Sequence, residues 1–184
     1  MLKIVVPAWE DWDPVQQKFV YGKETKLTLE HSLIAISKWE AKYKKPYLTD
    51  QPKTAEEALD YIRFMTIINP NKGISDDVYM HLTQDNLRQI EEYIGDPMTA
   101  TTFNRRNQPP HAKNKVTTSE EIYYSMAAFG IPFECQQWHF NRLLVLLEVA
   151  AIRNQPSKKM SNKDKYARNR SINAANRARF HSNG

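Results

Sequence analysis

The sequence has one cysteine, no long hydrophobic run and no secretory signal, and each absence excludes a class of protein. Because Cys135 is the single cysteine of 184 residues, no intramolecular disulfide can form, as is typical of a reducing compartment. The most apolar run, residues 143–152, contains Glu148 and is far shorter than the roughly 20 residues that span a bilayer. The apolar start, residues 1–7, is too short for a signal peptide. We expect a cytoplasmic protein with no membrane partner.

The sequence also lacks the patterns that accompany catalysis. It contains no glycine-rich phosphate loop and no activated-nucleophile signature. Cys135 and His139 stand four residues apart, which on one helix would place them on one face, but no further ligand pair accompanies them. The fragment 138–141 resembles a piece of a nuclease site yet lacks the acids or second histidine that would hold a metal. We therefore expect no enzyme, no catalytic residue, no metal and no cofactor.

Positive charge is concentrated at one end. The formal net charge of the chain is +5, but residues 153–184 hold nine Lys or Arg against the single acid Asp164, which gives +8 there and −3 for the rest. This tail has only a weak apolar face, so we expect it to be disordered, or helical only against a partner. Tyr166 and Phe180 lie among its arginines, so one alternative is that the tail binds nucleic acid through phosphate contacts and aromatic stacking. The cations concerned are Lys158, Lys159, Arg168, Arg170, Arg177 and Arg179.

Local signals predict a mainly α fold with a small β element at its start. The β-branched runs 3–6 and 18–21 predict a hairpin, which would have to lie on a helical body to be stable. A helical pattern begins at Leu27 and ends at Pro46; within it, His31 is expected to be a hydrogen-bonding histidine. Further helices are predicted by the capping boxes at 54–57 and 118–121 and by the segment from Thr83 to Gly95.

The stretch 132–152 predicts the helix around which the chain is organised. Its apolar residues cover most of its circumference, so it must be buried by something. Leu144 and Leu147 are predicted to lie in the core. Any residues that face a partner are expected on the neighbouring face, at Val145, Glu148, Val149 and Ile152.

These signals define the expected fold class and domains. The fold is mainly α: a compact helical domain with a small N-terminal β-hairpin and a basic C-terminal tail expected to be disordered. Residues 1–95 form the hairpin and a helical unit, 96–117 a polar linker or loop, 118–152 a helical pair on the same core, and 153–184 the tail.

Several segments together resemble a family of small proteins of long-tailed bacteriophages. They are residues 2–4, 29–33, 37–40, 97–101, 131–136, 138–143 and 158–161, and they span nearly the whole chain. The family consists of tail assembly chaperones, or tail-morphogenesis proteins, which keep the tape measure protein soluble while the tail tube polymerises around it. The resemblance implies a non-catalytic protein of the host cytoplasm that binds the tape measure protein or other tail proteins and can form a homo-oligomer. Trp138, His139, Asn141 and Arg142 match the family motif and either bind a partner or hold the fold together.

Two alternatives remain open. A nucleic-acid-associated protein would bind DNA or RNA with an affinity that falls steeply with salt. A structural virion component, such as a connector or tube-end protein, would co-purify with finished particles, whereas a chaperone would be missing from them.

Overall fold

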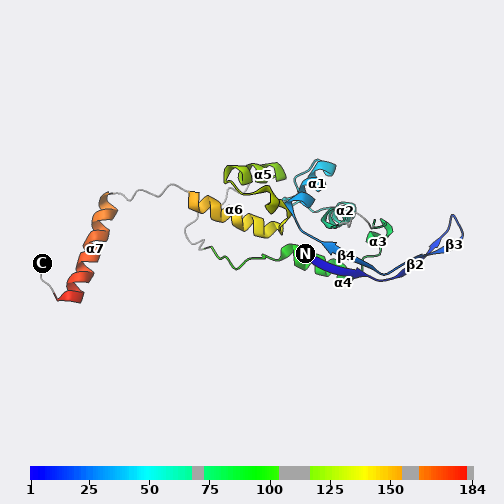
Figure 1. The fold of residues 1–184 in the computed structure, drawn as a ribbon, viewed down its shortest axis with the longest axis horizontal. Coiled ribbons are helices and arrows are strands. Elements are labelled where there is room, and N and C mark those ends of the chain that lie inside the picture. The colour runs from blue at the N-terminus through cyan, green and yellow to red at the C-terminus, as the bar shows by residue number, and fades with distance from the viewer. Residues whose placement is uncertain (68–72, 104–116, 155–161, 182–184) are drawn as a thin grey trace. The chain divides into compact units, whose positions relative to one another are not determined.

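The computed structural model describes residues 1–67, 73–103, 117–154 and 162–181. The fold is mainly α, as predicted, with a small β element at the N-terminus. The chain divides into two compact units, Met1–Ala151 and Ile152–Gly184. Figure 1 labels most of the elements of both.

The β element is one long hairpin made of two paired segments. β1 (Leu2–Val6) pairs with β4 (Thr25–Leu29), and β2 (Trp9–Asp13) pairs with β3 (Lys18–Gly22), all antiparallel. Val6 lies opposite Thr25 and Trp9 opposite Gly22, so the register is unbroken across the gap at Pro7. Pro7 has no N–H to donate to the ladder, which accounts for the gap. The predicted pairing of 3–6 with 18–21 is therefore wrong, because each run pairs with a partner that sequence analysis did not identify as a strand.

The base of this hairpin belongs to the core, and its tip does not. Ile4 and Val6 of β1 and Leu27 and Leu29 of β4 are buried on one face. Residues 27–29 therefore form a strand and not the start of a helix, because their apolar side chains alternate with polar ones at the period of a strand. In Figure 1, β2 and β3 extend beyond α3 (Asp77–Met80) as a ribbon.

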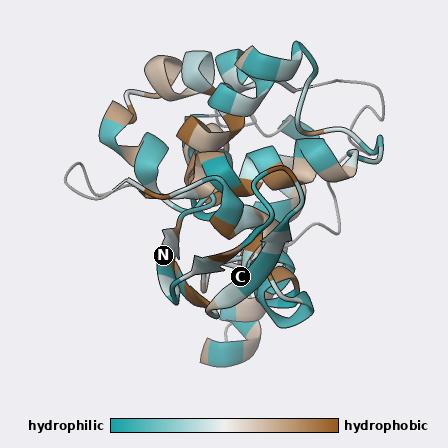
Figure 2. Ribbon diagram, turned by 90° about the vertical axis from the view of Figure 1, so that its right-hand side faces the viewer, coloured by the Kyte–Doolittle hydropathy of each residue, from teal (hydrophilic) through white to brown (hydrophobic). Residues whose placement is uncertain are grey.

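Five longer helices and a short 3₁₀ helix follow in the described part of the body. Bands of hydrophilic and hydrophobic residues alternate along them in Figure 2, as expected of helices that bury one side. The segments are α1 (Leu33–Tyr43), α2 (Ala55–Met65), α4 (Gln84–Gly95), α5 (Ser119–Ala128) and α6 (Phe140–Asn154), with a short 3₁₀ helix, η2 (Phe133–Gln137), before α6.

The helix starts follow the predicted caps in two cases out of three. The capping box at Thr54 and Glu57 is present, and Thr83 caps α4 in the same way with Asn86. Thr118 makes no side-chain cap bond. Instead, the backbone N–H of Ser119 donates to Oε2 of the buried Glu40 on α1, at 2.8 Å. A carboxylate from another helix thus replaces the predicted local cap of α5.

The core is centred on α1 and not on α6. Trp39 of α1 is buried, and its indole N–H donates to the carbonyl oxygen of Glu57 on α2 at 2.9 Å. In α6, Phe140 and Leu143 are the fully buried residues, while Leu144 is 37% exposed and Leu147 is half-buried. The prediction that Leu144 lies in the core is therefore wrong. The predicted helix from residue 132 is also two elements, so Cys135 and His139 do not share one helical face.

The second unit contains a helix where disorder is expected. α7 (Asn162–Phe180) is 19 residues long, and the side chains described along it are exposed. The prediction of a disordered tail is thus not confirmed.

Candidate protein-binding site

The residues 138–142 join α6 to the C-terminal end of α4. Nε2 of His139 donates to the carbonyl oxygen of Tyr93 at 2.9 Å. The amide of Asn141 donates to the carbonyl oxygens of Ile94, at 2.9 Å, and Asp96, at 2.7 Å. The last carbonyls of a helix have no partner within it. His139 and Asn141 therefore serve the fold by satisfying these groups.

Trp138 and Arg142 frame a shallow hollow beside this joint. The Arg142 guanidinium lies over the Trp138 ring, 4.4 Å from its centroid, in a cation–π contact. Val145, Leu146 and Val149 of α6 and the segment 98–101 line the rest of the hollow. Two of the four predicted partner-facing residues, Val145 and Val149, thus lie here and are half-buried. Glu148 is half-buried and Ile152 is 44% exposed, and neither lines the hollow.

A buried histidine pair lies behind the joint. The rings of His31 and His139 are 5.1 Å apart, and His31 Nδ1 is 2.5 Å from the Tyr61 hydroxyl. Burial, reinforced by the neighbouring His139, lowers the pKa of His31 to about 3. His31 is therefore neutral at physiological pH. The predicted role of His31 as a hydrogen-bonding histidine is confirmed, although it precedes α1 instead of lying within it.

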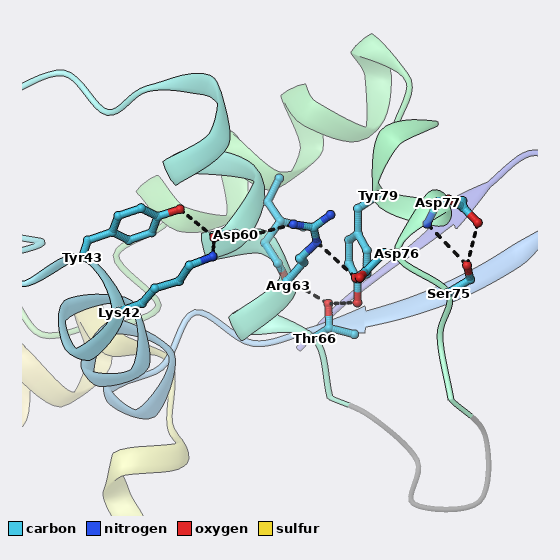
Figure 3. A network of polar contacts seen from close by, with 10 residues as sticks. Lys42, Tyr43, Asp60, Arg63, Thr66, Ser75, Asp76, Asp77 and Tyr79 are labelled. Carbon is cyan, nitrogen blue, oxygen red and sulfur yellow. Dashed lines mark hydrogen bonds and ion pairs between the residues drawn. The ribbon is translucent and has the colours of Figure 1, made fainter.

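A second polar cluster ties α1 to α2 (Figure 3). The buried carboxylate of Asp60 accepts hydrogen bonds from Lys42, from Tyr43 at 2.6 Å and from Arg63 at 2.7 Å. Burial alone would raise the pKa of Asp60, but these three donors outweigh it and lower the pKa to about 2. Arg63 extends the cluster to Asp76, with Nε 3.4 Å from Oδ1. The Asp60 carboxylate is held by donors from both helices, which fits a structural clamp.

Another apolar surface hollow of the body lies between α2, the segment 79–82 and α4. Its volume is about 470 Å³. Leu59, Leu82, Leu87 and Ile94 line it and are half-buried, and Met80 at its edge is 69% exposed. We name this hollow the α2–α4 groove. An amphipathic helix binds such a groove through apolar residues spaced at three and four positions.

The rim of the groove carries charge of both signs. Lys53 lies on the rim, with its ammonium 4.1 Å from the centroid of the Tyr47 ring. Glu91 of α4 also lies on the rim. Burial lowers the pKa of Lys53, although the neighbouring Glu57 opposes this effect. A partner helix with an acid and a base at matching positions would be held in one direction.

Sequence reasoning missed the groove because an apolar stripe does not show which of its residues stay partly exposed after the helices pack. Leu87, Ile90 and Ile94 do share one stripe, but Ile90 alone of these is fully buried. The available signal was the excess of apolar residues over what two short helices can bury: Leu59 widens the stripe of α2, and Leu82 adds an apolar residue just before α4.

The cations predicted for nucleic-acid binding divide into two groups. Arg168, Arg170, Arg177 and Arg179 are exposed on α7. Lys158 and Lys159 lie outside the residues that the structure describes. Among the described residues there is no group of three or more metal-binding side chains.

Comparisons with family models, with curated proteins and with solved structures found no match to this chain. No helix in the described part of the chain combines the length and the apolar character needed to cross a membrane.

Proposed function

We propose that the protein is a tail assembly chaperone of a long-tailed bacteriophage, which binds amphipathic helices of the tape measure protein in the α2–α4 groove. The observation that carries the proposal is the groove itself: half-buried leucine and isoleucine side chains from two helices, open to solvent along one side. A chaperone of this kind needs an apolar surface that accepts a helix before the final assembly exists.

The groove suits reversible binding. Leu59, Leu82, Leu87 and Ile94 already pack partly against the core, so binding a helix would cover surface without rearranging the fold. The hollow at Trp138 and Arg142 is the rival surface, but its apolar lining is smaller and comes mainly from one helix.

The test is co-expression of the chain with the candidate tape measure protein. Met80→Lys places a charge at the edge of the groove, at a site exposed enough to leave the fold intact, and should shift the tape measure protein into the insoluble fraction. Tyr124→Lys, on α5, is the matched control because Tyr124 is 76% exposed and lies outside the groove. Val149→Lys tests the rival hollow.

If the tape measure protein is equally soluble with the wild-type chain and with Met80→Lys, the assignment of the binding site to the groove is wrong. Loss of solubility with Val149→Lys alone would move the binding surface to α6. A chaperone should also be missing from finished particles, so stoichiometric recovery of the chain from purified particles would favour a structural virion component instead.

A further inference from the structure

Helix α7 carries two rows of cations on opposite sides. With 3.6 residues per turn, positions seven apart lie nearly above one another, so Lys163, Arg170 and Arg177 form one row. Lys165, Arg168 and Arg179 form the other row, and the six side chains are exposed. Asp164 is the single acid of the helix, and it belongs to the first turn. The rest of the helix carries no acid, and its cations lie in two groups, within residues 163–170 and 177–179, with the uncharged residues 171–176 between them.

The face between the two rows is made of small side chains. Ala167, Ser171, Ala174 and Ala178 follow one another at spacings of four, three and four residues, which keeps them on one face. This face is recessed: the surface is hollowed beside Lys163, Tyr166 and Arg170, along Ala167, Ser171 and Ala174. A wide ligand surface can therefore approach the backbone of α7 closely on this face. The two rows of cations then lie on either side of the contact.

The side chains of α7 favour a polyanion over an apolar partner. Ile172 is 47% exposed, and Tyr166, which lies at one edge of the hollow, is 71% exposed. The two are six positions apart and do not share one helical face. A helix that bound a protein groove would need an apolar stripe, and α7 has none of useful width. Two rows of cations instead match two rows of phosphates.

We propose that α7 binds double-stranded DNA by lying in the major groove, with one row of cations against each phosphate strand. An α-helix with its side chains is about 10–12 Å across, and the major groove of B-form DNA is about 12 Å wide. The small-residue face lets the helix enter the groove, and the flanking rows then lie beside the two backbones. These contacts read phosphate and not base sequence, so binding is independent of sequence.

The test is fluorescence anisotropy of the full-length protein with a labelled 20-base-pair DNA duplex over a range of salt concentrations. If five or six cations contact phosphate, the logarithm of the association constant should fall against the logarithm of the salt concentration with a slope of about −4.5 to −5.5. Arg170→Gln/Arg177→Gln removes two charges from one row, and Lys165→Gln/Arg179→Gln removes two from the other. Each pair should make the slope shallower by about 2, because both rows touch phosphate.

The control is Lys23→Gln/Lys26→Gln, which removes the same charge from exposed sites of the body and should leave the slope unchanged. If only one of the two double variants changes the slope, α7 does not lie between two phosphate strands, and the proposed placement is wrong. The major groove of A-form RNA is too deep and narrow for a helix, so duplex RNA should bind more weakly than duplex DNA. Equal binding of duplex RNA, or equally effective competition by poly-glutamate, would overturn the proposal. The tape measure protein is absent from this assay, so its outcome is independent of the chaperone function.

Discussion

Asn141 on α6 donates a hydrogen bond from its side-chain amide to the carbonyl oxygen of Ile94 on α4, at 2.9 Å. The same amide reaches the carbonyl oxygen of Asp96, so one side chain holds the end of α4 against the start of α6. The segment 138–142 is thus structural at its centre, while Trp138 is half-buried and Arg142 is exposed.

The first prediction tests this division of the motif. Asn141→Leu leaves the carbonyls of Ile94 and Asp96 without this donor, so the free energy of unfolding should fall by about 1–3 kcal/mol in urea denaturation. Arg142→Ala is the control, because it removes an exposed side chain of the same motif and should cost well under that amount. Equal losses from both would show that the cation–π pair is part of the fold.

The second prediction concerns the cap of α5. Glu40 accepts from the N–H groups of both Ser119 and Tyr47, each at 2.8 Å. Glu40→Ala should lower the free energy of unfolding by about 2–4 kcal/mol, since the buried Ser119 donor and the part-buried Tyr47 donor lose a charged acceptor. Thr118→Ala should change it by less than about 0.5 kcal/mol, because Thr118 makes no cap bond. A larger loss of stability in thermal melts for Thr118→Ala than for Glu40→Ala would instead support the capping box that the sequence predicts.

The third prediction is a dependence of stability on pH. The pKa of His31 is about 3 in the folded chain and about 6.5 when unfolded. Between these values the unfolded state binds the extra proton, so stability is complete above pH 6.5 and falls as the pH drops toward 3, by up to about 1.4 kcal/mol per pH unit. Urea midpoints of wild type and His31→Gln between pH 7 and pH 4 measure this. The variant should show the shallower decline, and parallel curves would assign the decline to other groups.

The fourth prediction compares two neighbours on α6. Leu143 is fully buried, and Leu144 is 37% exposed. Leu143→Ala should cost about 2–5 kcal/mol because it removes apolar contact and leaves a cavity, whereas Leu144→Ala should cost less than about 1 kcal/mol. Guanidinium denaturation of the two variants measures the difference. Similar losses would mean that α6 is buried on both sides.

Sequence predicted the features that depend on near neighbours. The Thr54–Glu57 capping box lies within one helical turn, so its residues suffice to define it. The cap at Ser119 could not be predicted in this way, because its acceptor, Glu40, lies 79 residues earlier in the chain. The pairing of β1 with β4 was not predicted for the same reason, because β2 and β3 lie between these two strands in the sequence.

The candidate site shows the same limit. The apolar stripes of α2 and α4 can be seen in the sequence. Which of their residues stay partly exposed, however, depends on how the two helices pack. Leu87 and Ile90 belong to the same stripe, yet Ile90 is 3% exposed and Leu87 is half-buried in the wall of the groove. Only the packed structure distinguishes them.

Amide hydrogen exchange of the full-length protein, with and without the tape measure protein, tests the central claim most directly. If an amphipathic helix binds the α2–α4 groove, exchange should slow in residues 55–65 and 79–94, and it should stay unchanged in α5. Met80→Lys should abolish the protection. Protection confined to α6 and residues 98–101, or no protection of the body at all, would contradict the account.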